Sequence, residues 1–191
     1  MLDDLIVSRV RIKILKLYFL NPDKIFHLRE IQRQTNEAMN AIRREMNYLK
    51  DCGFMTSEYR GNRKYFTARK DSPLYFDLLA LFNKMYGLGG EIIKNKLRLG
   101  KVKFVMLSGK FVRGKEKSSN EVDLLVVGRV ILPELAQIIK SEEKRKGREI
   151  NYTIMTEEEF SFRKKRRDPF ILSVLYHSRI MIIGDEEELL K

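Results

Sequence analysis

Two apolar runs, joined by a short polar segment, constrain this chain more than any other feature. The first run, 104–107, leads into the glycine turn 108–110, and the second run is 124–127. Short apolar runs bounded by turn residues are typical of buried strands. Because side chains alternate along a strand, we expect Glu121 and Asp123, just before the second run, to point the same way. Two carboxylates beside a glycine turn are what a divalent metal carrying a nucleotide triphosphate requires.

Further residues of this segment fit a known pattern: Gly109, Arg113, Gly114, Ser119, Asp123, Leu124, Leu125, Val126 and Val127. With them the segment resembles the nucleotidyltransferase superfamily typified by polymerase beta, in its minimal prokaryotic form. The resemblance implies an α/β domain with a mixed sheet. It also implies nucleotide binding at Gly109, Lys110 and Arg113, and magnesium with a nucleotide triphosphate at Glu121 and Asp123.

The departures from that family fall on the chemistry. Lys110 stands where the family has serine, Glu121 where it has the first metal-binding aspartate, and Asn151 where a third carboxylate belongs. Glu149 lies two residues from Asn151 and is the alternative base. Magnesium demands near-octahedral geometry, and glutamate is one methylene longer than aspartate. We therefore expect a retained fold with poor or absent turnover, and a Lys110 that favours an anion over a metal.

Charge points to a polyanionic partner. The 191 residues carry a formal net charge of +12, which favours nucleic acid; the alternative is a basic protein that its charge merely keeps dispersed.

The single cysteine, Cys52, excludes an intramolecular disulfide and is expected to be buried near a helix end. The chain shows no signal peptide and no apolar run long enough to span a membrane, so we expect a cytoplasmic protein without a membrane partner.

The N-terminal part predicts three helices and a hairpin. The helices are expected from Ser8 to about residue 19, over 28–35 and over 38–51; strands 54–59 and 64–68 flank a tight turn at 60–63. The residues 28–31, 42–45, Leu49 and 53–54 make this order similar to the winged helix-turn-helix of ArsR-like transcriptional regulators. The resemblance implies binding of duplex DNA.

In a helix-turn-helix, the second helix of the unit enters the major groove. Ile42 and Met46 are expected to face inward, which turns the polar residues of helix 38–51 outward. Arginine pairs well with guanine and asparagine with adenine, and a basic hairpin suits phosphates. The alternative is a solvated polar face with a charged hairpin. The predicted DNA-binding residues are Met39, Asn40, Arg43, Arg44, Asn47, Arg60, Arg63 and Lys64.

The predicted fold class is α+β. It has a winged helix-turn-helix domain at 1–70, connecting helices at 71–100 and a nucleotidyltransferase-like domain at 101–191. Helix 73–86 is apolar nearly all round, so we expect it to be buried between domains or across a homodimer axis. The glycines at 87–90 should break it before a helix over 91–99. The remaining predictions are helices 133–146, 156–167 and 169–176, and strands 102–107, 150–155 and 179–184.

We expect a homodimeric DNA-binding transcriptional regulator whose degenerate nucleotidyltransferase-like domain serves as a sensor, with a nucleotide as its expected ligand, or as a dimer scaffold. One alternative is a metal-dependent enzyme that transfers nucleotides to a protein or small molecule. Another is an antitoxin-like partner of a toxin protein. The basic run 163–167 either extends the polyanion surface or is a solvated helix face.

Overall fold

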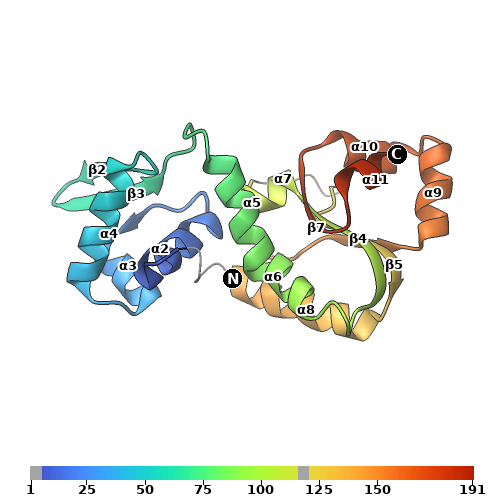
Figure 1. Ribbon diagram of the computed structural model, residues 1–191, viewed down its shortest axis with the longest axis horizontal. Helices are drawn as coiled ribbons and strands as arrows, with labels where there is room; N and C mark the ends of the chain where they lie inside the picture. Colours follow the sequence, from blue (N-terminus) through green and yellow to red (C-terminus); the bar gives the residue numbers. More distant parts are fainter. Residues whose placement is uncertain (1–5, 116–120) are drawn as a thin grey trace. The chain divides into compact units, whose positions relative to one another are not determined.

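The chain has a mixed α+β fold in the computed structural model, which describes residues 6–115 and 121–191 (Figure 1). It divides into two compact units, Met1–Asn83 and Lys84–Lys191. Each unit has its own sheet and its own buried core. The division falls inside the segment 71–100, which the sequence predicts to connect two domains.

Over residues 6–70, the first unit contains three helices and a small antiparallel sheet. Its elements are α2 (Arg9–Phe19), β1 (Phe26–His27), α3 (Leu28–Thr35), α4 (Met39–Asp51), β2 (Met55–Arg60) and β3 (Arg63–Ala68). The sheet order is β1-β3-β2, and β2 and β3 form a hairpin in which Arg60 pairs with Arg63. The helices and the hairpin match the predicted elements to within a few residues. The two-residue strand β1 was not predicted, since so short a strand leaves no periodic signal.

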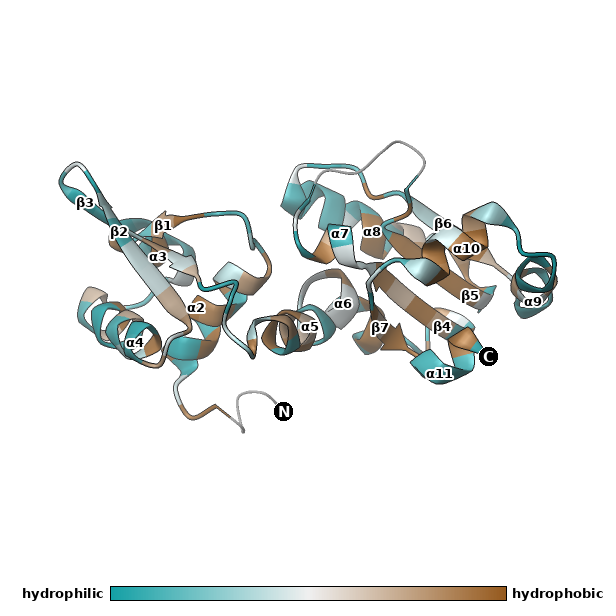
Figure 2. Ribbon diagram, turned by 90° about the horizontal axis from the view of Figure 1, so that it is seen from above, coloured by the Kyte–Doolittle hydropathy of each residue, from teal (hydrophilic) through white to brown (hydrophobic). Residues whose placement is uncertain are grey.

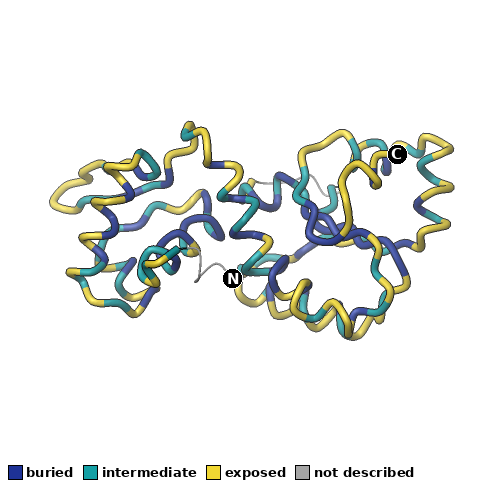
Figure 3. The backbone as a smooth tube through the Cα atoms, in the orientation of Figure 1, coloured by how far each residue is buried: buried dark blue, intermediate teal, exposed yellow. Residues whose placement is uncertain are grey.

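The core of the first unit forms where the helices turn their apolar faces inward. Ile14, Ile31, Ile42 and Met46 are fully buried, one or two from each helix. The spacing of Ile42 and Met46 places both on one face of α4. Figure 3 shows the consequence: yellow alternates with dark blue and teal along α4, because one face of the helix is exposed and the other is buried.

Helix α5 (Tyr75–Met85) is buried on one face rather than all round. Tyr75 and Phe82 lie inward, and the rings of Phe19 and Phe82 stack with centroids 5.3 Å apart. By contrast, Leu74, just before the helix, and Phe76 are 52% and 53% exposed. Within the chain, therefore, apolar side chains at the start of this helix remain accessible.

The second unit is built on a four-stranded mixed sheet. Its elements are α6 (Gly87–Lys94), β4 (Gly100–Ser108), α7 (Gly109–Val112), β5 (Leu124–Val130), α8 (Leu132–Lys146), β6 (Tyr152–Met155), α9 (Glu157–Lys165), α10 (Pro169–Tyr176), β7 (Arg179–Ile183) and α11 (Glu186–Leu190). The strand order is β6-β5-β4-β7. The β5–β6 pair is parallel, and the other two pairs are antiparallel.

The two central strands form the middle of the core of the second unit. Phe104, Met106, Leu125 and Val127 alternate along β4 and β5, and they pack against buried side chains from α9, α10 and α11. The intervening residues of both strands are buried as well. Strands that are buried on both faces read as continuous apolar runs, which is why the sequence reveals them clearly. Figure 2 shows these strands in brown.

Several predicted boundaries are wrong. Helix α5 ends at Met85, so the predicted break at the glycines of 87–90 is confirmed, but these glycines also form the first turn of α6, and α6 ends at Lys94 rather than near residue 99. A Cβ atom at Gly90 would lie 2.5 Å from the carbonyl oxygen of Met85, so glycine permits the tight passage from α5 into α6. The short helices α7 and α11 were not predicted. Cys52 is exposed at the end of α4, because it follows the last inward-facing turn of that helix.

Candidate functional site

The outward face of α4 carries the polar residues that the sequence assigns to DNA. Asn40, Arg43, Arg44 and Asn47 are exposed, and Met39 is half-buried at the first turn of the helix. None of the four exposed side chains is needed for the core, since Ile42, Met46 and Leu49 fill the inner face. Arginine and asparagine side chains that do not pack in the core can contact the edges of bases.

A concavity of about 350 Å³ lies between the start of α4 and the hairpin. It brings together four of the predicted residues, Met39, Arg43, Arg63 and Lys64. Arg60 lies at the end of β2, ion-paired with Glu58 at 2.5 Å. The structure adds residues that sequence analysis missed, namely His27, Leu28, Arg29 and Asn62. Arg29 has the residue type of a phosphate contact, but its place beside α4 follows only from the tertiary fold.

A buried carboxylate fixes α4 against α2. Glu45 is only 5% exposed and accepts hydrogen bonds from Ser8 Oγ at 2.7 Å and Arg11 Nε at 2.8 Å. The Arg11 guanidinium in turn lies 3.9 Å from the ring centroid of Tyr48 on α4. Charge-assisted hydrogen bonds of this kind are strong when they are shielded from water. They hold the orientation of the exposed α4 face.

The second unit contains a cavity of about 200 Å³ at the ends of β4 and β5. Lys110, Arg113, Glu121 and Asp123, all predicted site residues, line it, and Gly109 lies at its edge. Sequence analysis missed the other wall, which is one face of α10: Phe170, Ser173, Val174 and His177. Their spacing of three and four residues is the helical periodicity that could have identified the face, but not the cavity it lines. Ser119 lies outside the described residues.

Both predicted metal ligands are already engaged by the protein. Glu121 and Asp123 line the same cavity, as expected, but they are not part of a strand, because β5 begins at Leu124. The alternation of side chains along a strand therefore does not explain why both face the cavity. Lys110 Nζ lies 2.5 Å from Glu121 Oε1. Asp123 is 1% exposed, and its Oδ2 accepts a hydrogen bond from the Asn151 backbone N–H at 3.0 Å.

Asn151, which stands where the third metal-binding carboxylate is expected, makes hydrogen bonds to both Glu121 and Asp123. It precedes β6, and its carbonyl oxygen accepts from the Asp123 N–H at 2.8 Å. Its side-chain Nδ2 donates to the Glu121 carbonyl oxygen at 3.3 Å. Glu149, the alternative base, is exposed and does not contribute to the described lining of this cavity. Asn151 therefore ties the two carboxylate positions to β6 and supplies no charge.

In this structure, both predicted ligands would have to change their contacts before they could hold a magnesium–triphosphate centre. Across residues 6–115 and 121–191, no group of three or more His, Cys, Asp or Glu side chains is placed to hold a metal ion. Magnesium needs carboxylates that are free to complete an octahedral shell. Here a metal ion would have to displace the Lys110 ammonium and break the Asp123 hydrogen bond.

Gly109 is required by packing at the cavity wall. A Cβ atom there would lie 2.1 Å from Ser178 Oγ and 2.8 Å from the Ser178 carbonyl oxygen, and the Gly109 N–H donates to that oxygen at 2.6 Å. The glycine turn therefore lets the chain before β7 approach the start of α7. Ser108 Oγ caps α7 by accepting from the Phe111 N–H at 3.1 Å.

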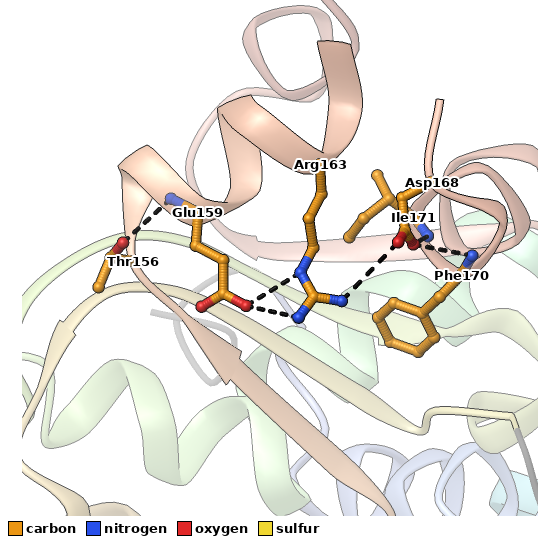
Figure 4. Close-up of polar contacts among 6 residues, drawn as sticks. All are labelled: Thr156, Glu159, Arg163, Asp168, Phe170 and Ile171. Atoms are coloured by element: carbon orange, nitrogen blue, oxygen red, sulfur yellow. Dashed lines mark hydrogen bonds and ion pairs between the residues drawn. The ribbon is translucent and has the colours of Figure 1, made fainter. Parts of the chain in front are cut away.

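The cavity wall on α10 is positioned by a polar network at the α9–α10 junction (Figure 4). Asp168 caps α10, with Oδ1 accepting from the N–H groups of Phe170 at 3.0 Å and Ile171 at 3.2 Å. Arg163 on α9 pairs with Glu159 at 2.7 Å and lies 3.9 Å from Asp168. The network fixes where α10 begins, and thereby where Phe170 meets the cavity.

The same network accounts for part of the basic run 163–167. Arg163 belongs to the network, and Lys164 Nζ donates to the Leu189 carbonyl oxygen at 2.7 Å. The Arg166 guanidinium lies 4.5 Å from the Phe162 ring centroid. Lys165, Arg166 and Arg167 are exposed. The run therefore combines structural contacts with a solvated face, and the polyanion alternative remains a hypothesis for its exposed members.

Comparisons with family models, with curated proteins and with solved structures gave no match to this chain. In the described part of the chain, every helix is too short or too polar to cross a lipid bilayer.

Proposed function

We propose that this chain is a DNA-binding transcriptional regulator whose first unit is a winged helix-turn-helix. The observation that carries the proposal is the convergence of Arg29, Arg43, Arg63 and Lys64 on one concavity between α4 and the hairpin. Exposed arginine and asparagine on a helix, flanked by a basic hairpin, suit a major groove and its phosphates. The net charge of +12 favours the same partner.

The test is direct binding to duplex DNA. Oligonucleotides selected from a random pool should bind the full chain, and the logarithm of the binding constant should fall linearly with the logarithm of the salt concentration. Fluorescence anisotropy of a labelled duplex measures both. Absence of salt-dependent binding to any selected sequence contradicts the proposal.

For the second unit, we propose a nucleotidyltransferase-like domain that has lost catalytic power and serves as a sensor or dimer scaffold. The succession β4, Gly109, α7 and β5, with Glu121 and Asp123 at one cavity, supports the likeness. The engagement of Glu121 by Lys110 favours the regulator over the enzyme. Incubation with labelled nucleotide triphosphates, magnesium and candidate acceptors should give no label transfer. Transfer that disappears in Asp123→Ala would establish the enzyme instead.

A homodimer completes the proposal. Leu74 and Phe76 are half-exposed beside a helix whose other face is buried. Helix-turn-helix dimers bind two half-sites about 34–36 Å apart on one face of the duplex. Pairing of two α5 helices would cover this apolar surface and present two copies of α4 to one operator.

A further inference from the structure

Three cationic residues lie where α8 ends. Arg145 and Lys146 belong to the last turn of the helix, Gly147 ends it in a left-handed conformation, and Arg148 follows. Cations in the last turn are stabilised by the helix dipole, which accounts for Arg145 and Lys146. The effect of the dipole falls off beyond that turn, so it does not account for Arg148.

The acidic side chains of the same turn are engaged by other groups. Glu142 is buried and accepts hydrogen bonds from Arg145 Nε at 2.7 Å and Nη2 at 2.5 Å. Glu143 Oε1 accepts from the Ile150 backbone N–H at 2.9 Å. These contacts direct both carboxylates to other groups, so the charges of Lys146 and Arg148 are only weakly offset.

Lys146 and Arg148 both lie against one aromatic ring. The Phe111 ring centroid is 4.6 Å from Lys146 Nζ and 5.0 Å from Arg148 Cζ. Phe111 is buried, and unlike its neighbour Lys110 it is not among the described residues that line the cavity at the ends of β4 and β5. The ring therefore holds two cations close together, outside the lining of that cavity.

This arrangement costs stability in the free protein. Nη2 of Arg148 is buried and has no hydrogen-bond partner among the residues that the structure describes. Burial, with added repulsion from Arg145 and Arg148, lowers the pKa of Lys146 to about 8. A buried donor without an acceptor and a desolvated ammonium are both unfavourable. Unfavourable positive charge of this kind is typical of a site that a bound anion completes.

We propose that Lys146 and Arg148 form a site for a phosphate group, which accepts hydrogen bonds from the ammonium and the guanidinium. Both groups bind phosphate oxygens through charge-assisted hydrogen bonds. Two sources offer this chemistry, namely the backbone of a nucleic acid and a free oligophosphate. In either case the anion supplies the counter-charge that the two cations lack. The site belongs to the second unit and does not depend on DNA recognition by α4.

Nuclear magnetic resonance of the Lys146 side chain in the full chain tests the site specifically. The chemical shift of its Cε atom gives the pKa of Lys146 with and without tripolyphosphate, at an ionic strength held constant with sodium chloride. Tripolyphosphate should raise this pKa by about one pH unit or more, because a nearby anion stabilises the ammonium. A pKa that neither tripolyphosphate nor DNA changes overturns the proposal.

The same Cε signal, followed during a tripolyphosphate titration, gives the affinity of this site. Arg148→Ala should weaken binding at least about tenfold, since it removes a charged partner of the phosphate. Arg148→Lys keeps a cation and should lose less, which separates loss of the contact from loss of the fold. Unchanged affinity in Arg148→Ala would contradict the assignment.

A second arm with duplex DNA identifies the source of the phosphate. If the nucleic-acid backbone fills the site, a duplex of random sequence also raises the pKa of Lys146. Lys146→Met and Arg148→Ala should then each reduce by about one the slope of the logarithm of the DNA-binding constant against the logarithm of the salt concentration. If a free oligophosphate fills the site, both variants bind DNA like wild type and only tripolyphosphate raises the pKa.

Lys144→Met is the matched control, because Lys144 is exposed in the same turn of α8. It should leave tripolyphosphate binding at Lys146 unchanged. A loss equal to that of Arg148→Ala would reduce the effect to general attraction by the net charge and overturn the site. Arg43→Ala, in the first unit, should also leave this binding unchanged, so failure of the site and failure of the regulator are distinguishable.

Discussion

Lys146, at the end of α8, carries a partly buried charge. Burial lowers its pKa to about 8, against the attraction of Glu142 and with added repulsion from Arg145 and Arg148. Its Nζ lies 4.6 Å from the ring centroid of the buried Phe111, which follows Lys110 in α7. The folded protein holds the proton of such a lysine less tightly than the unfolded chain does. At a pH where the lysine is protonated in both states, its charge therefore lowers the free energy of unfolding.

Replacing Lys146 with methionine should therefore stabilise the protein at neutral pH. The penalty is fully present below pH 8, and it is relieved as the pH rises toward 10.5, where the unfolded lysine also loses its proton. We expect a gain of about 1–2 kcal/mol at pH 7, because the cost of the lowered pKa exceeds the lost cation–π contact. Urea unfolding at pH 7 and at alkaline pH measures it, and the difference from wild type should shrink with rising pH. The exposed Lys144→Met is the control; a destabilised Lys146→Met at pH 7 would refute the account.

At the scale of elements, α10 depends on its N-terminal cap. Asp168→Ala removes the acceptor for the N–H groups of Phe170 and Ile171 and should cost about 1–2 kcal/mol of unfolding free energy. Asp168→Asn keeps an acceptor and should lose less. Arg163→Ala breaks only partly exposed ion pairs and should cost less than about 1 kcal/mol. Chemical denaturation compares the three; an Arg163→Ala loss equal to that of Asp168→Ala would assign the junction to the ion pairs.

Elements with a strong apolar pattern, either a continuous run or a helical spacing, could be predicted from the sequence. The strands around 104–107 and 124–127, and the inner face of α4 with Ile42 and Met46, rest on apolar patterns that only burial explains. The start of α6 could not, because the need for Gly90 arises from contact with Met85. In the same way, Glu121 and Asp123 could be singled out, but the Lys110 partner and the α10 wall depend on tertiary contacts.

At the scale of the whole molecule, we predict a homodimer held by α5. Replacing both Leu74 and Phe76 with glutamate should yield a folded monomer, because like charges would meet across the axis. Light scattering after size-exclusion chromatography measures the mass of each species. Leu97→Glu changes a side chain that is 96% exposed in the second unit and should leave the dimer intact. A wild-type monomer at all accessible concentrations would rule out this assembly.

Recognition of duplex DNA by α4 is the central claim, and one comparison tests it most directly. Fluorescence anisotropy should be recorded for wild type, Arg43→Ala, Arg44→Ala and Arg129→Ala on a selected duplex and on a scrambled one. Arg129 is exposed in the second unit, so its replacement removes the same charge and leaves α4 unchanged. We predict that each α4 variant loses about 1–3 kcal/mol on the selected duplex and discriminates less between the two sequences, while Arg129→Ala binds like wild type. Equal losses in all three variants would contradict recognition by α4.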